Sequence, residues 1–333
     1  GHTLGAVSLV DYRRLSDGIW LSYAGALVLL VMVLAVGEER FGGRRWLRFF
    51  GMSVQPSELA KLALLLTLAW MLSRPGTDAA RWRTLGVVGV VTLLPVVLIL
   101  KEPDLGTALV CLPIAGAMVF AAGASLRHLG VLALAGLLAA SLLFGVVLVP
   151  RWLGWDETRQ KAVFSRVTRL KEYQWKRLVV FVDPAVDRTG AGYNSWQSSI
   201  SVGSGGMTGK GYMRGTQSTL GYLPRTVAPT DFIFSVIAEE TGFAGSAAVL
   251  GLYGVLMVCG MWTAARARDA LGRLISVGVT AMVAAHVFVN IAMTIGAMPV
   301  TGIPLPLVSY GGSFMLCTMA AFGLVQSVAI RRL

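Results

Sequence analysis

The fold is decided by residues Leu274 to Ile330, which read LISVGVTAMVAAHVFVNIAMTIGAMPVTGIPLPLVSYGGSFMLCTMAAFGLVQSVAI. The stretch contains no Lys, Arg, Asp or Glu, and His286 is the one residue in it that titrates near neutral pH. A bilayer crossing takes about 20 predominantly apolar residues. The stretch therefore predicts two crossings joined by a connector rich in Pro and Gly.

Further uncharged runs precede this stretch, and each predicts one more crossing. They are Gly18 to Gly37, Leu62 to Ser73, Thr84 to Leu100, Leu105 to Leu126, Leu129 to Val149 and Thr241 to Ala265. Hydrophobic residues make up 55% of the 333-residue chain, charged residues only 14%. A soluble protein of this composition would expose large apolar patches, whereas a bilayer favours apolar side chains on the outside as well. We expect an all-α polytopic membrane protein with eight crossings, forming a single integral membrane domain over residues 1–333.

The formal net charge of +12 indicates membrane orientation and not a nucleic-acid partner, because the arginines gather in short loops. On the face that we assign to the cytoplasm these are Arg13, Arg14, Arg74, Arg81, Arg83, Arg127, Arg266, Arg268, Arg273, Arg331 and Arg332. The opposite face carries a second set against this bias, namely Arg40, Arg44, Arg45, Arg48 and Lys101. Two interpretations stay open for the second set: binding of an anion, or snorkelling of the side chains to headgroups.

Residues 150–230 form the one long hydrophilic segment, which the topology places outside the cell as a large extracytoplasmic loop. Its first part, Arg151 to Arg177, mixes Trp152, Trp155 and Trp175 with many basic residues. This mixture is typical of an amphipathic helix in the headgroup layer. The second part is rich in glycine, which indicates either close approach of backbone to a ligand or a loop that wraps around helix ends.

Carboxylates and cations gather at the outer ends of the predicted crossings. Glu58 and Lys61 are spaced i, i+3 on one helix face, Glu102 and Asp104 occupy the next outer turn, and Asp231 closes the long loop. One interpretation is a set of interfacial salt bridges, with Glu58 and Lys61 paired to each other. A transporter would place polar groups nearer the bilayer midplane. The arrangement favours an anionic, lipid-linked substrate that reacts at headgroup level, with cations on a diphosphate and a carboxylate accepting a proton.

A series of ordered motifs from about Asp11 to the C-terminus resembles the SEDS family of polytopic proteins typified by RodA and FtsW. The motifs are Gly43 to Trp46, Gln55 to Lys61, Glu102 to Ala108, Arg177 to Pro184, Gly203 to Gln217, Thr230 to Phe234 with Glu239 to Phe243, Pro299 to Pro306 and Ser309 to Gly312. With Pro304, the stretch Gly302 to Pro306 is similar to that of the RodA branch of the family. One departure is Pro224-Arg225, where relatives often carry Pro-Glu.

The resemblance implies a ten-helix family fold, of which this chain shows eight crossings. The apolar piece before Asp11 is too short to span, and Gly1 stands where an initiator Met belongs, so we expect the chain to begin partway through a longer protein. The implied activity is a peptidoglycan glycosyltransferase that polymerises lipid II at the outer face of the bacterial cytoplasmic membrane, for cell elongation and rod shape. A lipid II flippase and a structural scaffold of a cell-wall complex are the alternatives.

The resemblance also implies roles for single residues. Asp231 would be the catalytic carboxylate that deprotonates the 4-hydroxyl of the acceptor sugar. An ordinary Asp is a weak base with a pKa of about 3.9, so burial or a divalent cation, Mg²⁺ or Mn²⁺, is expected to assist it. The expected substrate-binding residues are Arg44, Arg45, Trp46, Glu58, Lys61, Glu102, Asp104, Lys210, Gln217 and Thr230. Expected partners are a class B penicillin-binding protein, which is a transpeptidase, membrane lipids and other elongation-complex proteins.

Overall fold

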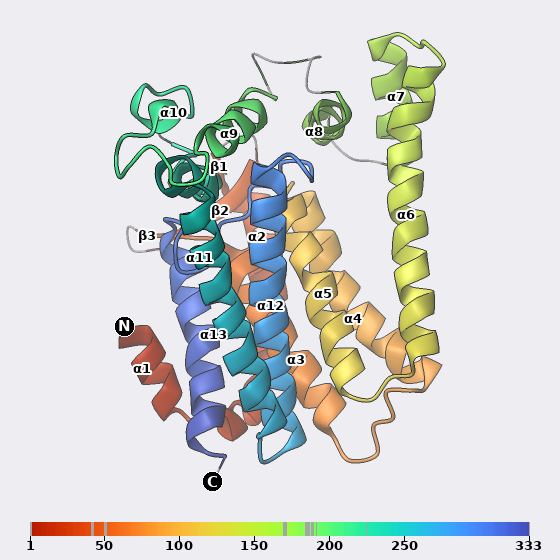
Figure 1. Ribbon diagram of the computed structural model, residues 1–333. Helices are drawn as coiled ribbons and strands as arrows, with labels where there is room; N and C mark the ends of the chain where they lie inside the picture. Colours follow the sequence, from red (N-terminus) through yellow and green to blue (C-terminus); the bar gives the residue numbers. More distant parts are fainter. Residues whose placement is uncertain are drawn as a thin grey trace. The chain divides into compact units, whose positions relative to one another are not determined.

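The computed structural model describes residues 2–40, 43–49, 52–168, 172–183, 187, 190, 192–224 and 226–332. Over these residues the protein is an α-helical multi-pass membrane protein, as the apolar runs predict (Figure 1). Seven described helices are long and apolar enough to cross a bilayer. They are α2 (Ile19–Val36), α3 (Pro56–Ser73), α4 (Trp82–Lys101), α6 (Leu126–Trp152), α11 (Ile233–Ala265), α12 (Ala270–Thr294) and α13 (Gly312–Ile330).

The remaining predicted crossing is α5 (Leu105–Ala121), an apolar helix of 17 residues. Asp104 caps its start, because the Asp104 side chain accepts a hydrogen bond from the backbone N–H of Thr107. The helix ends earlier than the uncharged run that predicted it. Gly123 adopts a φ of 96°, a conformation that glycine takes without a Cβ clash, and this turn stops the helix.

The chain divides into two compact units. The first comprises Gly1–Leu126, Ala247–Val289 and Gly302–Leu333, and the second comprises Arg127–Ser246 and Asn290–Thr301. In the first unit α2 packs on α3, α4 packs on α5, and α3 also packs on α5. The single domain expected over residues 1–333 stays a prediction.

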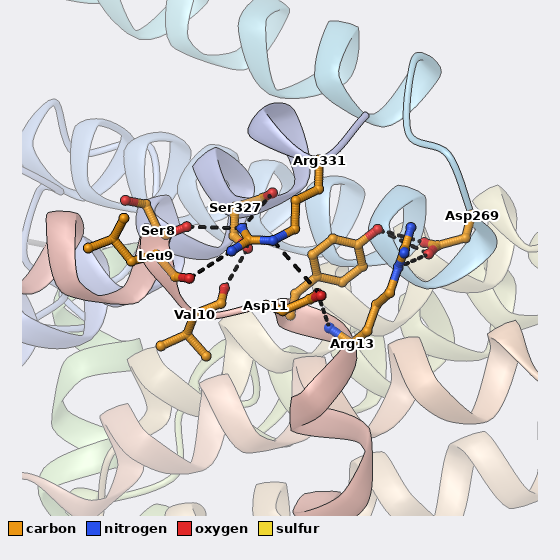
Figure 2. A network of polar contacts seen from close by, with 9 residues as sticks. Ser8, Leu9, Val10, Asp11, Arg13, Asp269, Ser327 and Arg331 are labelled. Atoms are coloured by element: carbon orange, nitrogen blue, oxygen red, sulfur yellow. Dashed lines mark hydrogen bonds and ion pairs between the residues drawn. The ribbon is translucent and has the colours of Figure 1, made fainter. Parts of the chain in front are cut away.

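At the amino end of the first unit, α1 (His2–Leu9) packs along α13 (Figure 1). The Arg331 guanidinium, just after α13, donates to the backbone carbonyls of Ser8 and Leu9 at 3.1 and 2.7 Å (Figure 2). Ser327 of α13 donates through its hydroxyl to the Val10 carbonyl at 2.7 Å. Hydrogen bonds from the charged Arg331 guanidinium and from the Ser327 hydroxyl therefore join the end of α1 to the end of α13.

The segment after α1 is a 3-10 helix, η1 (Tyr12–Gly18), tied to the start of α12. Asp269 accepts from Arg13 Nε at 2.9 Å (Figure 2). It also accepts from the Tyr12 hydroxyl at 3.0 Å and from the backbone N–H of Gly272 at 2.7 Å. Burial and the neighbouring Asp269 carboxylate raise the pKa of the Tyr12 phenol. Asp269 thus caps α12 and fixes η1 with one carboxylate.

A small antiparallel sheet lies between α2 and α3 in the chain, where the sequence predicted only a short outer loop. Its strands are β1 (Glu38–Arg40), β2 (Gly43–Phe49) and β3 (Met52–Val54), in the order β1-β2-β3. Leu47 on β2 is buried, whereas its neighbour Arg48 is exposed and pairs with Glu38. This alternation is that of a strand with one covered face.

In the second unit, the end of α6 carries two amphipathic helices, α7 (Glu157–Thr168) and α8 (Glu172–Val182). Val147 of α6, Phe164 of α7 and Trp175 of α8 form a buried apolar cluster with neighbouring residues. Trp152 is 87% exposed, and its place in the headgroup layer stays a prediction. Trp175 differs from that expectation because it packs inside the cluster. The position of α7 on a membrane surface stays a prediction.

Candidate functional site

The end of the first unit at which α3 and α5 begin carries a buried carboxylate network centred on Asp104. Asp104 Oδ2 accepts hydrogen bonds from Gln55 Nε2 at 2.8 Å, Ser57 Oγ at 3.3 Å and Thr107 Oγ1 at 2.8 Å. Asp104, Ser57 and Thr107 are buried. The carboxylate is therefore held by donors at the starts of α3 and α5, which fixes the two helix ends relative to each other.

Arg45 of β2 lies against the neighbouring turn. Its Nε donates to the Glu102 carbonyl at 3.2 Å, and one terminal nitrogen donates to the Pro103 carbonyl. The Glu102 side chain is fully buried, and neither carboxyl oxygen has a hydrogen-bond partner among the described residues. Burial, aided by Asp104 and opposed by Arg45, raises the pKa of Glu102 to about 9. Glu102 is thus neutral at pH 7, a state that the sequence did not predict.

Glu58 and Lys61 form a buried ion pair on the first turns of α3. Lys61 Nζ lies 2.9 Å from Glu58 Oε1, and the two residues are 1% and 4% exposed. Lys61 Nζ also lies 2.8 Å from His286 Nε2 on α12 and 5.6 Å from the centre of the Phe314 ring on α13. The pairing of Glu58 with Lys61 is the interpretation that the spacing had left as an alternative.

The space around this ion pair is small. A cavity of about 10 Å³ borders Glu58, Lys61, His286 and Phe314, which is room for about one water molecule and not for a phosphate. Sequence reasoning did not include His286 or Phe314 in the site. The signal available was that His286 is the one titratable residue in an otherwise uncharged run.

In the second unit the glycine-rich loop packs against a kink in α11. Gly242 interrupts that helix with φ of 67° and ψ of −162°. The kink leaves backbone groups without helical partners, and the loop supplies them. Lys210 N–H donates to the Glu239 carbonyl at 3.0 Å, and Phe243 N–H donates to the Gly206 carbonyl at 2.8 Å. The loop therefore packs against a helix, as one of the two interpretations expects, and close approach of its backbone to a ligand stays a prediction.

The loop also delivers Lys210 to a fully buried carboxylate, Glu239 of α11. Lys210 Nζ lies 2.6 Å from Glu239 Oε1, which also accepts from Thr216 Oγ1 at 2.9 Å and from the Gln217 backbone N–H at 3.1 Å. Ser201 Oγ donates to the other oxygen at 3.0 Å. Lys210 thus neutralises a buried charge, and its partner Glu239 belongs to a motif that the sequence analysis named without assigning it to the site.

Three further predicted site residues lie between Lys210 and Glu239 in the chain. Gln217 is half-buried, and its side-chain oxygen is buried with no hydrogen-bond partner among the described residues. Thr230 and Asp231 are half-buried and lie in a turn just before α11. The Asp231 carbonyl accepts from Asn290 Nδ2 at 2.8 Å. Phe232, next in the chain, is buried against Leu223 and Ala228, so the turn that carries Asp231 is fixed by packing.

The predicted site residues therefore fall into two groups. The first unit contains Arg44, Arg45, Trp46, Glu58, Lys61, Glu102 and Asp104, and the second contains Lys210, Gln217, Thr230 and Asp231. Arg44 is exposed and Trp46 is half-buried on β2. Pro184 and Arg225, named among the motifs, lie outside the described residues. Over the described part of the chain, no three His, Cys, Asp or Glu side chains gather as a metal-binding group.

The motifs that build these two groups match a known family. A family model of cell cycle proteins, FtsW/RodA/SpoVE, matches residues 3–332. The chain belongs to the FtsW/RodA/SpoVE family. One similar relative of this family is the peptidoglycan glycosyltransferase MrdB of Escherichia coli, 36% identical over 99% of this chain and 84% of its own length. The peptidoglycan glycosyltransferase RodA of Treponema pallidum is also 36% identical, over 98% of this chain and 86% of its own length.

Solved structures agree with membership of the FtsW/RodA/SpoVE family. A chain in a structure titled for the coordination of polymerization and crosslinking by a peptidoglycan synthase complex matches with a TM-score of 0.77 and 35% identity. That match covers 99% of this chain and 86% of the other. The rod shape determining protein RodA of Thermus thermophilus matches with a TM-score of 0.67 and 33% identity, over 99% and 83% of the two chains.

Proposed function

We propose that this protein polymerises lipid II into glycan strands at the outer face of the bacterial cytoplasmic membrane, for cell elongation. The protein is a peptidoglycan glycosyltransferase of the FtsW/RodA/SpoVE family, and its relatives carry that activity in their names. The observation that carries the proposal is the fixed turn of Asp231: a half-buried carboxylate follows the only long hydrophilic segment and stands at the start of a crossing helix.

In the proposed reaction Asp231 is the general base. It accepts the proton of the acceptor 4-hydroxyl while the oxygen attacks the anomeric carbon of the donor sugar. The new C–O bond forms as the bond to the diphosphate breaks, and the diphosphate takes the electron pair, with inversion at the anomeric carbon. The bond from Asn290 to the Asp231 carbonyl and the burial of Phe232 support this role, because a base must be held in place to act.

The cationic and polar residues expected from the sequence are the proposed contacts of the substrate. Two N–H groups of Arg45 donate to backbone carbonyls, and a guanidinium has five N–H donors, so the others can bind a phosphate oxygen. We propose that Lys61, already paired with Glu58, contributes through its charge. Arg44, Trp46, Glu102, Asp104, Lys210, Gln217 and Thr230 complete the proposed set.

A divalent cation, Mg²⁺ or Mn²⁺, is proposed as an assisting ion. Among the described residues, no group of three His, Cys, Asp or Glu side chains is placed to bind one metal ion. Mg²⁺ is commonly held by one or two carboxylates together with substrate phosphates, so Asp231 and the diphosphate are the donors that fit. When bound, such an ion would stabilise the charge that develops on the leaving diphosphate.

The proposed partner is a class B penicillin-binding protein within the elongation complex. The solved structure titled for a peptidoglycan synthase complex contains a chain similar to this one over nearly its whole length, which supports an assembly of this kind. A transpeptidase would cross-link the strands that this protein extends.

The test is polymerisation of labelled lipid II by the purified protein in liposomes, with and without the transpeptidase. We expect glycan strands on gels, with more product when the partner is present. Asp156 provides a matched control for Asp231→Asn, because its exposed carboxylate accepts the backbone N–H of Arg159 and is not among the proposed site residues. Asp156→Asn is expected to polymerise as the wild type does. Transbilayer movement of lipid II without polymer would instead favour the flippase alternative.

A further inference from the structure

The first unit contains a cavity at the end opposite to Glu58 along α3. It lies where α3 ends at Ser73 and α4 begins at Trp82, and its volume is about 320 Å³. Its lining comes from the last turn of α3, the connecting loop and the first two turns of α4. The basic and acidic residues of this lining are Arg74, Asp78, Arg81 and Arg83, and Trp70, Leu72 and Val88 belong to its apolar part.

The charge of this lining is positive. Arg74, Arg81 and Arg83 face a single carboxylate, Asp78, so three positive charges minus one negative charge leave two. Arg81 is the one that pairs with Asp78, at 3.2 Å. Arg74 is held by stacking, with its guanidinium carbon 3.6 Å from the centre of the Trp70 ring. A guanidinium fixed in this way presents its N–H donors at low entropic cost to a phosphate.

The apolar and the basic residues of the lining lie at different positions along the two helices. Leu72 and Val88, which face the cavity from the two helices, are buried. The arginines lie at the helix ends, and Trp82 at the first position of α4 is 56% exposed. Tryptophan and arginine at the end of a crossing helix are typical of headgroup depth, with the apolar side chains at the depth of the acyl chains.

We propose that this cavity binds the headgroup of an anionic glycerophospholipid. The phosphodiester lies among Arg74, Arg81 and Arg83, and the first carbons of the acyl chains lie against the apolar wall. A free phosphate would also bind the arginines, but it would make no apolar contact with Leu72 and Val88. Basic pockets at the ends of crossing helices on the arginine-rich side are the places where such lipids are recognised. The lining of this cavity shares no residue with either group of proposed site residues.

The test is a lipid titration of the purified full chain by native mass spectrometry. The probes are dioleoyl phosphatidylglycerol, dioleoyl phosphatidylcholine and glycerophosphoglycerol, which has the anionic headgroup without acyl chains. We expect phosphatidylglycerol to bind more tightly than phosphatidylcholine. Each of Arg74→Gln and Arg83→Gln should weaken phosphatidylglycerol binding about fivefold, and the double variant about 25-fold. Glycerophosphoglycerol at the same concentration should not displace the lipid.

Arg266→Gln is the matched control. Arg266 also stacks on a tryptophan, with its guanidinium carbon 4.0 Å from the centre of the Trp262 ring, but neither residue lines this cavity. This variant should bind phosphatidylglycerol as the wild type does. The double variant Arg74→Lys/Arg83→Lys keeps both charges and should lose less than the double glutamine variant, which separates a loss of charge from a loss of folding.

Three outcomes would overturn the proposal. The first is wild-type phosphatidylglycerol affinity in the double glutamine variant, and the second is equal affinity of the wild type for phosphatidylcholine. The third is displacement of the lipid by glycerophosphoglycerol at equal concentration, which would reassign the cavity to a free phosphate compound. A double lysine variant that unfolds at the wild-type temperature yet binds as weakly as the glutamine variant would also count against it.

Discussion

Lys61 Nζ lies 2.8 Å from His286 Nε2, and this contact joins α3 to α12 inside the first unit. The other ring nitrogen, Nδ1, lies 2.8 Å from the Met282 carbonyl, which can only accept a hydrogen bond. Nδ1 therefore carries the proton, and Nε2 accepts from the Lys61 ammonium group. The imidazole is neutral, because a protonated ring would direct two N–H donors at one ammonium and one carbonyl. Lys61 is thereby held between an anion, Glu58, and a neutral acceptor.

The first prediction concerns this buried charge. Lys61→Met leaves the Glu58 carboxylate buried without its cation, so we expect the free energy of unfolding to fall by about 3–5 kcal/mol. Glu58→Gln/Lys61→Met removes both charges and should recover most of that loss. The measurement is denaturant unfolding in mixed micelles. Arg48→Met is the control, because the Arg48–Glu38 pair is exposed, and it should change the free energy by less than about 1 kcal/mol. A double variant as unstable as Lys61→Met would contradict this account.

The second prediction is a pH dependence that arises from Glu102. Its pKa is about 9 in the folded protein, raised by burial from an ordinary 4.5. Between these two values the folded protein keeps a proton that the unfolded chain releases, so stability from this group falls as the pH rises. Glu102→Gln keeps the neutral shape and removes the titration. We expect the wild type to lose thermal stability relative to this variant between about pH 4.5 and pH 9; parallel stability curves over that window would disprove it.

The third prediction concerns the kink in α11. A Cβ at Gly242 would lie 2.4 Å from the backbone nitrogen of Gly209, at a φ of 67° that other residues rarely adopt. Gly242→Ala should therefore destabilise the protein by about 1–3 kcal/mol and speed hydrogen exchange at the Lys210 and Phe243 amides. Gly251→Ala is the matched control in the same helix, because a Cβ there meets no atom within 4 Å. That variant should be neutral or stabilising by up to about 1 kcal/mol. Equal effects of the two substitutions would contradict the close contact between Gly242 and the backbone of Gly209.

Local signals in the sequence were enough for the helices and for part of the site. Uncharged runs predicted each crossing, since a bilayer demands that length and polarity. The i, i+3 spacing placed Glu58 and Lys61 on one face, and they are paired. The strands of the small sheet were not predicted, because β1 and β3 have only three residues each and such runs carry little periodic signal.

What the sequence could not predict depends on partners that are far apart in the chain. His286 lies 225 residues from Lys61, and Glu239 lies 29 residues from Lys210. No periodicity in the sequence encodes either contact. The role of Gly242 was hidden as well, since a glycine in an apolar helical run is compatible with an unbroken helix. The neutral state of Glu102 follows from its burial, which only packing determines.

The last prediction concerns Asp231, on which the proposed mechanism depends. The alternative role is a helix cap, worth about 1 kcal/mol when lost. The geometry favours a base, because α11 begins at Ile233, two residues beyond Asp231, and the Asp231 backbone is already fixed by Asn290. Asp231→Asn keeps the shape and removes the charge. A lost general base lowers the rate by about 10²–10⁴-fold, so we expect polymerisation of lipid II to slow at least about 100-fold.

Two measurements on the Asp231→Asn protein separate a base from a cap. The first is thermal unfolding, which should stay within about 1 kcal/mol of the wild type, because the backbone bond from Asn290 and the packing of Phe232 do not use the carboxylate. The second is binding of lipid II, which should be retained, since a base acts on the rate and not on the affinity for the ground state. A folded variant that binds lipid II and polymerises it at a near-normal rate would remove Asp231 from the mechanism. The search for the base would then move to Asp104, whose carboxylate, at the start of α5, is held by hydrogen bonds from Gln55 and Thr107.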